Sequence, residues 1–315
     1  MTAKQVYCVL HTSSLRYSGA CLQSLLRQSI DNVDLNLLVD SEEQAEIFRN
    51  EILNWKVPSG HSITVRDPLE VDEAASSAFS RLPNLIRFRN GHPCWRKITD
   101  AALLTREEAI IIDPDVYFLR RFRFDPTPKN QLLLMWQPRN CLFPFNAVDS
   151  MFQAGVPLAD NTDIGIAQIH DTMDWDWIDG IVAKLDLESN RSFMHVESIV
   201  WAAIAIKKGG NFLSPHRWTC YAESSKRRLG KLFGLQIPHD LLHLNLEVSN
   251  AIHLGGSAGS AKRDLDILKK ASSSSVPGRT PMCNERLNFK TYKYSKFFLK
   301  KTTVKFLSLL GLKVG

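Results

Sequence analysis

The hydrophobic positions of this chain form short continuous apolar runs, separated by stretches in which apolar residues recur every three or four positions. Continuous runs of this length are typical of strands that are buried on both faces. The spacing of three and four is typical of amphipathic helices. The runs that predict strands are 6–10, 35–39, 63–65, 109–112, 132–136, 164–169 and 212–213. Their alternation with helices favours an α/β protein with a mostly parallel central sheet and helices on its faces.

Three of the predicted helices have recognisable starting points. Ser41 stands three residues before Gln44, which is the spacing of a capping box at a helix N-terminus. A second helix is predicted to open at His92-Pro93 and to run towards Leu104. A third is predicted over 197–207, where apolar side chains share one face.

Composition places the chain among ordinary globular proteins. It has 315 residues, of which 44% are hydrophobic and 23% charged, enough for one large domain or two modest ones. The six cysteines stand far apart, so we expect reduced thiols and a cytoplasmic location. We see neither a signal peptide nor an apolar run long enough to span a membrane.

The formal net charge of +6 is concentrated near the C-terminus. A serine-rich break divides the chain into a main domain (1–270), a linker (271–284) and a basic C-terminal segment (285–315). The last segment interleaves lysines with aromatic and aliphatic residues, which suits an amphipathic helix on an anionic membrane. The alternative is a helix packed on the main domain with its lysines outward. Nucleic acid is not expected, because no recognition motif accompanies the charge.

Two carboxylates follow the most apolar of the predicted strands. Asp113 and Asp115 come directly after 109–112, with Pro114 between them. Residues two apart on a strand point the same way, and ligands bind beyond the carboxyl ends of strands in open α/β sheets. Carboxylate oxygens suit Mn²⁺ or Mg²⁺. The alternative reading is an acidic, solvated turn with no ligand.

The segment 110–116 resembles the Asp-x-Asp segment of nucleotide-sugar glycosyltransferases with the Rossmann-like GT-A fold. The family 8 enzymes, the glycogenin and bacterial lipooligosaccharide galactosyltransferase group, look most similar. Three further segments match in the expected order: Trp95-Arg96-Lys97, Asp163–Ala167 and His253–Gly256. The resemblance extends from the first strand to about Lys262, and its weight lies in the order and spacing of the segments.

The resemblance implies roles for several polar side chains near the donor sugar. Arg96, or else Lys97, would contact the donor and help to orient Asp113. Asp163 stands where the family has asparagine, and would accept hydrogen bonds from sugar hydroxyls in the catalytic site. Glu197, at the opening of a helix, would bind the acceptor or stabilise the developing charge.

The same resemblance implies a metal site and a diphosphate site. His253 would be the third metal ligand, beside Asp113 and Asp115. Gly256 would let the backbone approach the diphosphate closely, and Lys262 would contact it. The polar turn that begins His11-Thr12, at the end of the first strand, would hold the nucleotide.

The function implied is a metal-dependent transfer of a sugar from a nucleotide-diphosphate donor, a UDP-sugar being favoured, with retention of configuration. The acceptor would be a glycan or a lipid-linked glycan, with the enzyme peripheral on the inner face of the membrane. One alternative is a non-catalytic, membrane-associated scaffold that has kept a transferase fold. A haloacid-dehalogenase-like phosphatase is disfavoured, because Tyr117 stands where that class usually has threonine or valine and no later acidic motif follows.

Overall fold

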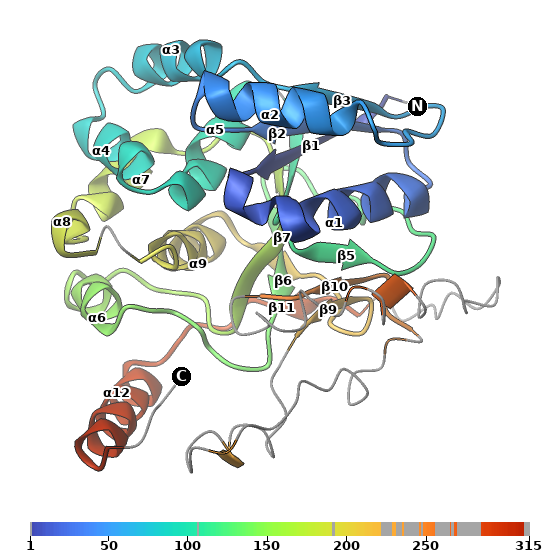
Figure 1. The fold of residues 1–315 in the computed structure, drawn as a ribbon. Helices are drawn as coiled ribbons and strands as arrows, with labels where there is room; N and C mark the ends of the chain where they lie inside the picture. The colour runs from blue at the N-terminus through green and yellow to red at the C-terminus, as the bar shows by residue number, and fades with distance from the viewer. Residues whose placement is uncertain are drawn as a thin grey trace.

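A mixed eight-stranded sheet, in the order β11-β8-β6-β7-β4-β1-β2-β3, forms the centre of the protein in this computed structural model (Figure 1). A second sheet has the order β5-β10-β9. The strands are β1 (Lys4–Val9), β2 (Val33–Leu38), β3 (Ser62–Val65), β4 (Glu108–Ile112), β5 (Val116–Phe118), β6 (Leu132–Trp136), β7 (Thr162–His170), β8 (Gly210–Phe212), β9 (Trp218–Cys220), β10 (Ala251–His253) and β11 (Leu287–Asn288). The structure describes residues 2–105, 107–190, 193–221, 229–230, 235, 246, 248–255, 265, 268–269 and 285–311.

The large sheet is mostly parallel, as predicted. Strand β1 runs parallel to both β2 and β4, β2 to β3, and β6 to β8. Strand β7 runs antiparallel to β4 and β6, and β11 runs antiparallel to β8, which makes the sheet mixed. The carboxyl ends of β1, β2 and β4 therefore share one edge of the sheet, where ligands bind in open α/β sheets.

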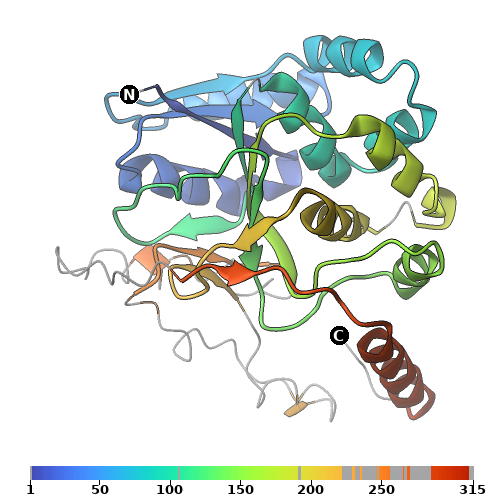
Figure 2. The ribbon, with the colours of Figure 1, turned by 180° about the vertical axis from the view of Figure 1, so that it is seen from behind.

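Helices cover both faces of the large sheet, and Figure 2 shows this layering from behind. Helices α1 and α2 pack on one face, while α3 to α7 and α9 pack on the other. The helices are η1 (Thr12–Ser14), α1 (Leu15–Gln28), α2 (Glu42–Ile52), α3 (Pro68–Ala78), α4 (Pro83–Gly91), η2 (Pro93–Trp95), α5 (Arg96–Leu104), α6 (Phe145–Gln153), α7 (Trp175–Val182), α8 (Leu187–Asn190), α9 (Val196–Lys208) and α12 (Tyr294–Leu309).

Alternating side chains of the central strands supply both layers of the core. In β1, Val6 and Cys8 pack against α1 and α2, while Tyr7 and Val9 join the opposite cluster. In β4, Ile111 joins the same cluster as Tyr7. Both faces of these strands are buried, which explains why the sequence shows continuous apolar runs rather than an alternating pattern.

The predicted strands and helices agree with the structure within a few residues, but one predicted cap is only half formed. Ser41 accepts a hydrogen bond from the backbone N–H of Gln44, with 3.3 Å between the atoms. In the part of the chain that is described, Gln44 Oε1 has no hydrogen-bond partner, so the reciprocal bond of a capping box is missing. Helices α3, α4, α6 and α7 were not predicted. Two of them start at a proline in the first turn, where proline is compatible with a helix.

The basic C-terminal segment (285–315) adds strand β11 to the large sheet and then forms helix α12, which packs on α6 through buried Phe297. Its lysines do not all face outward: Lys296 pairs with Asp160 at 2.5 Å and Lys301 with Asp149 at 2.7 Å. Among the described residues, no helix is long and apolar enough to cross a membrane. The large apolar side chains that α12 exposes include Phe298, Leu299, Phe306 and Leu309.

Replacing Gly210 with alanine is expected to lower the free energy of unfolding by about 1–3 kcal/mol. Gly210 has a φ of +129°, and an added Cβ would lie 1.9 Å from the backbone oxygen of Leu132, so β8 would have to leave β6. Gly180→Ala in α7 is the matched control: the new Cβ meets no described atom within 4 Å, and removing a helical glycine is expected to raise stability. Denaturant unfolding measures both, and equal midpoints for Gly210→Ala and wild type would contradict the pairing of β6 with β8.

Candidate metal site

Asp113 and Asp115 lie in a turn rather than on a regular strand. Strand β4 stops at Ile112, and the backbone N–H of Val116 donates to the carbonyl of Asp113, with 3.2 Å between the atoms, to close the turn. The predicted strand alternation is therefore not what brings the two carboxylates together. Strand β5 starts directly after the turn and pairs with β10, with Val116 opposite His253. This antiparallel pairing places the imidazole beside the acidic turn.

The structure brings Asp113, Asp115 and His253 together, although they come from distant parts of the chain. His253 Nε2 lies 3.2 Å from Asp115 Oδ1 and 3.5 Å from Asp113 Oδ2. One ligand atom from each residue fits within 4.8 Å of the other two. Two carboxylates and an imidazole, nearly buried, are a donor set that suits a divalent cation. These three residues therefore fit the predicted metal ion. That they bind it stays a prediction.

A third carboxylate, Asp163 in β7, holds the His253 ring from the other side. His253 Nδ1 lies 2.8 Å from Asp163 Oδ2, and both side chains are buried. Burial alone would raise the pKa of Asp163, but the charge of His253 outweighs it and the pKa is lowered. When a cation displaces the Nε2 proton, the proton that stays on Nδ1 keeps the ring directed at the acidic turn, as in metal-binding histidines held by a carboxylate. This arrangement makes Asp163 a positioning residue, whereas its predicted contact with a sugar stays a prediction.

Gly165 leaves room for the imidazole. A Cβ built at Gly165 would lie 2.5 Å from His253 Cγ, which is closer than packed atoms approach. The backbone carbonyl of the same glycine accepts a hydrogen bond from the Asp113 N–H, with 2.9 Å between N and O. Gly165, two residues after Asp163, therefore allows both the His253 ring and the acidic turn to pack against β7.

Among the described lysines and arginines, Lys97 is the one that contacts the acidic turn. Its Nζ lies 2.6 Å from Asp113 Oδ1 and 2.6 Å from Glu197 Oε1, and all three side chains are nearly buried. Burial would lower the pKa of Lys97, but the two carboxylates outweigh it and raise the pKa well above its usual value. Burial, with repulsion from Asp113 adding to it, raises the pKa of Glu197 to about 8 although Lys97 opposes the shift. Carboxyls with a pKa this far from normal cluster at functional sites.

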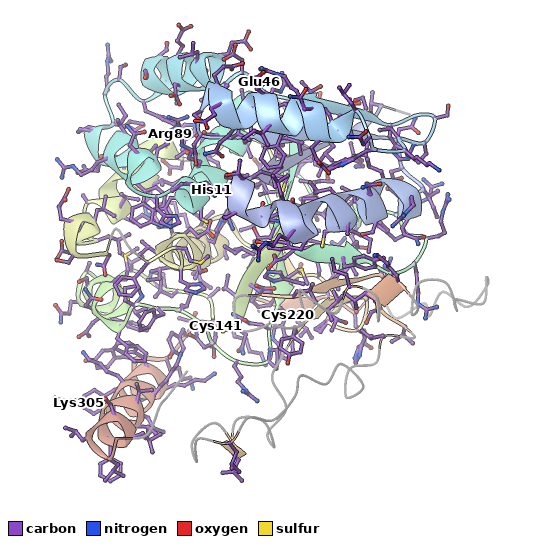
Figure 3. The ribbon with its side chains drawn as sticks, in the orientation of Figure 1. His11, Glu46, Arg89, Cys141, Cys220 and Lys305 are labelled. Carbon is purple, nitrogen blue, oxygen red and sulfur yellow. The ribbon has the colours of Figure 1, made fainter. Side chains whose placement is uncertain are left out.

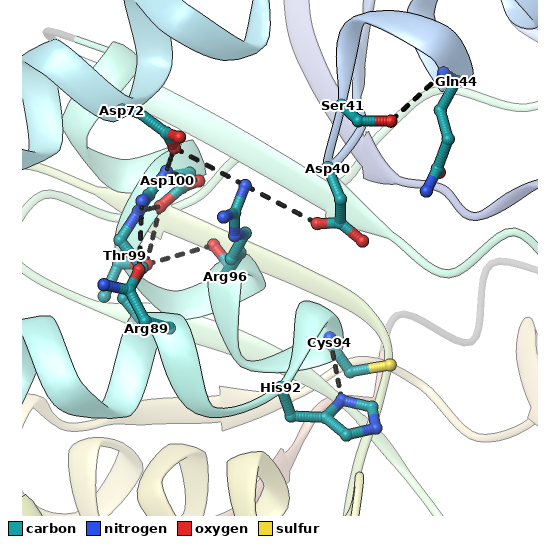
Figure 4. A network of polar contacts seen from close by, with 11 residues as sticks. Asp40, Ser41, Gln44, Asp72, Arg89, His92, Cys94, Arg96, Thr99 and Asp100 are labelled. Atoms are coloured by element: carbon teal, nitrogen blue, oxygen red, sulfur yellow. Dashed lines mark hydrogen bonds and ion pairs between the residues drawn. The ribbon is translucent and has the colours of Figure 1, made fainter.

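Arg96, the alternative to Lys97, points to a different part of the sheet edge. Figure 4 shows its guanidinium between Asp40, which follows β2, and Asp72 in α3. The distances from Arg96 Nη1 to the two carboxylates are 3.5 Å and 3.6 Å. Of the two predicted candidates, Lys97 is thus the one that orients Asp113. A contact between Arg96 and a donor stays a prediction.

The polar turn after β1 lines a pocket of about 550 Å³ at the same edge of the sheet. His11, labelled in Figure 3, caps the short helix η1 by accepting a hydrogen bond from Ser13 N, at 3.1 Å. Thr12 and Arg16 line the pocket as well. A pocket of this size is within the range of small-molecule sites. Nucleotide binding by His11 and Thr12 stays a prediction. The predicted diphosphate contacts Gly256 and Lys262 lie outside the described residues, and so does the predicted linker 271–284.

Cys220 also lies beside His253, although no feature of the sequence predicts this position. It stands opposite His253 in the parallel pairing of β9 with β10, 33 positions earlier in the chain. Its thiol, Asp163 and His253 each offer one ligand atom within 4.8 Å of the others. Only the strand register brings these residues together, and register is not readable from cysteine spacing.

Asp163→Asn is expected to weaken Mn²⁺ binding by about 10–100-fold, the usual effect of losing the hydrogen-bond acceptor behind a metal-binding histidine. Asparagine keeps the shape but can turn its NH₂ towards Nδ1, which would reverse the tautomer of His253. Titration of Mn²⁺ followed by electron paramagnetic resonance measures the affinity. Asp31→Asn, which alters a carboxylate that binds Arg123 and the Phe124 N–H, is the control and should bind Mn²⁺ as wild type does. If Asp163→Asn binds Mn²⁺ with wild-type affinity, Asp163 does not position His253 for metal binding.

Comparison by sequence finds no match among protein-family models and none among curated proteins. By structure, the chain is similar to mouse xyloside xylosyltransferase 1 in its apo form, with 11% identity, a TM-score of 0.48, and 80% of this chain and 98% of that chain covered. It is also similar to the apo bifunctional glycosyltransferase WbbM, with 11% identity, a TM-score of 0.41, and 87% of this chain and 50% of that chain covered. The structural likeness to glycosyltransferases that the sequence predicts is thus present, at low identity. What the chain does has to be inferred from the chemistry of the site.

Proposed function

We propose that the protein is a metal-dependent glycosyltransferase that takes a nucleotide-diphosphate sugar as donor. The observation that carries this proposal is the convergence of Asp113, Asp115 and His253 at the carboxyl edge of the sheet. The pocket lined by His11 at the same edge supports a nucleotide site there. The resemblance of the segment 110–116 to the acidic segment of family 8 enzymes points to the same chemistry.

In this proposal the acidic turn and the imidazole hold Mn²⁺ or Mg²⁺, which when bound stabilises the charge that builds on the departing diphosphate. Lys97 holds Asp113 Oδ1, which leaves Oδ2 directed at the imidazole. Asp163 holds His253 from behind, so the ligands need little rearrangement when a cation binds. The contribution of these residues is preorganised binding rather than proton transfer.

Glu197 is the residue best placed to meet the sugar or the acceptor. Its Oε1 accepts from Lys97, while its Oε2 is buried and lacks a hydrogen-bond partner among the described residues. A buried carboxyl oxygen without a partner costs free energy unless a ligand supplies one. With a pKa of about 8, Glu197 can hold or release a proton near neutral pH. We therefore assign it the contact with a substrate hydroxyl.

The experiment that tests the proposed function is a panel of nucleotide sugars, with UDP-sugars first, incubated with the protein and Mn²⁺ or with a chelator. We expect release of the nucleoside diphosphate from at least one donor, lost on chelation and restored by metal. If no donor is turned over, and Asp113→Asn binds the nucleotide as tightly as wild type does, the non-catalytic scaffold is favoured instead. Release of inorganic phosphate from simple monoesters would favour a phosphatase.

We further propose that α12 brings the enzyme to a lipid-linked acceptor on an anionic membrane, in the cytoplasm. Three of its lysines already contact the main domain, while Phe298, Leu299 and Phe306 are 56%, 68% and 59% exposed. Leu299→Glu with Phe306→Glu is expected to reduce binding to phosphatidylglycerol vesicles at least about tenfold, since each buried side chain contributes roughly 1.5 kcal/mol or more. Vesicle cosedimentation measures this, with Thr302→Glu and Thr303→Glu as the charge-matched control. Equal losses in both double variants would show that charge alone matters.

A further inference from the structure

The imidazole of His253 stands between two different sets of buried donor atoms. Its Nε2 faces the carboxylates of Asp115 and Asp113, at 3.2 Å and 3.5 Å. Its Nδ1 faces Asp163 Oδ2 at 2.8 Å. Asp163, Cys220 and His253 form a second group whose ligand atoms lie within 4.8 Å of one another, and all three are buried. One side of the ring thus offers oxygen ligands only, and the other offers oxygen and sulfur.

A second thiol lies near the sulfur side of the ring. Cys141 is exposed, and its Sγ lies 3.1 Å from Gln137 Oε1. The Sγ of Cys220 lies 3.9 Å from the same oxygen, so Gln137 connects the exposed thiol to the buried one. Figure 3 labels both cysteines on this part of the molecule. The exposed thiol and the buried one therefore share a single hydrogen-bond acceptor.

We propose that Asp163, Cys220 and His253 form a second cation site, which takes a thiophilic divalent ion such as Zn²⁺ or Cd²⁺ and thereby prevents binding of the hard cation at Asp113 and Asp115. Thiolate and imidazole select soft and borderline ions, whereas carboxylates alone suit Mn²⁺ and Mg²⁺. The two sites share a single imidazole. The antagonism rests on the proposed function, while the existence of the thiol site does not.

The antagonism follows from the lone pairs of the ring. A neutral imidazole has one nitrogen that carries a proton and one that can bind a cation. An ion at Nδ1 leaves the proton on Nε2, which then donates to Asp115 instead of binding metal. An ion at Nε2 leaves the proton on Nδ1, which donates to Asp163 as in the present structure. His253 can therefore complete either site, but only one at a time.

A cation that binds at the Cys220 thiol displaces its proton and gains a thiolate ligand. Three protein ligands leave a fourth tetrahedral position for water, the arrangement that Zn²⁺ accepts in open sites.

The thiol site is tested by titrating the full chain with Cd²⁺ and recording the ultraviolet charge-transfer band of a cadmium–thiolate bond. We expect a saturable band at one equivalent in wild type. Cys220→Ser should lose it, and Cys141→Ser, the matched control beside the same Gln137, should retain it. A band that survives in Cys220→Ser, or one that disappears in Cys141→Ser, would overturn the assignment.

The antagonism is tested by electron paramagnetic resonance of Mn²⁺ with and without one equivalent of Zn²⁺. We expect Zn²⁺ to weaken Mn²⁺ binding by about 10–100-fold in wild type, and far less in Cys220→Ser, a coupling of ordinary size between two sites. Equal displacement in both proteins would show that Zn²⁺ competes directly at Asp113 and Asp115, and would overturn the antagonism. If Mn²⁺ fails to bind even without Zn²⁺, the proposed function fails, while the cadmium band still decides the thiol site.

Discussion

Asp113→Asn is expected to lower metal-dependent turnover of a nucleotide sugar about 1000-fold, because a metal stabilises the departing charge by several kcal/mol and each 1.36 kcal/mol is a factor of ten. Asp113 is the residue on which two interactions converge: Lys97 binds Oδ1 and the imidazole of His253 faces Oδ2. Asparagine preserves the shape of the side chain but removes the charge that both partners need. Initial rates over a range of Mn²⁺ concentrations separate lost affinity from lost turnover.

Asp174→Asn is the matched control for this substitution. Asp174 caps helix α7 by accepting from Trp177 N, at 3.1 Å, far along the chain from the acidic turn. Asparagine serves as well as aspartate at a helix N-cap, so this variant should keep wild-type rate and stability. If the rate of Asp113→Asn stays within about threefold of the rate of this control, the substitution has removed no important transition-state contact. Asp113 is then not a metal ligand.

Lys97→Met is expected to lower the free energy of unfolding by about 3–5 kcal/mol, the usual cost of removing one partner of a buried ion pair. The change leaves the nearly buried Asp113 carboxylate without its cation, and it takes from Glu197 the charge that opposes its raised pKa. Urea unfolding in the presence of a chelator measures the loss. Lys296→Met, which breaks the exposed pair with Asp160, should change stability by less than about 1 kcal/mol.

Two companion measurements separate this charge effect from a packing defect. Adding Asp113→Asn to Lys97→Met removes the uncompensated carboxylate and should restore part of the lost stability. Mn²⁺ should stabilise Lys97→Met more than it stabilises wild type, because the ion replaces the missing positive charge beside Asp113. If neither change restores stability, Lys97 acts by filling space and not by its charge.

Much of the fold was predictable because burial acts directly on the sequence pattern. The strand after Glu107 was recognisable from its run of isoleucines, and the helix after Asp40 from its capping serine. Helix α3 was missed, because its buried side chains are few and small and tertiary packing compensates. The reversed direction of β7 was not readable either, since parallel and antiparallel buried strands have the same apolar pattern.

The main residues of the candidate site were predictable, but the contacts between them were not. Asp113, Asp115 and His253 were identified from motif order, and the register of β5 with β10 brings them together. The choice of Lys97 over Arg96 required the orientation of α5, which adjacent positions in a sequence cannot give. Cys220 required the register of β9 with β10. Local pattern thus predicts which side chains line an edge, whereas strand pairing decides which of them touch.

The central claim is that one divalent ion is held jointly by the acidic turn and by His253. The measurement that tests it most directly is the anomalous diffraction of Mn²⁺ in crystals grown with Mn²⁺ and UDP. We predict a single strong peak coordinated by Asp113, Asp115 and His253 Nε2, with the diphosphate completing the coordination shell. A structure with UDP bound but no manganese there, and with Nε2 still bonded to Asp115, would contradict the account.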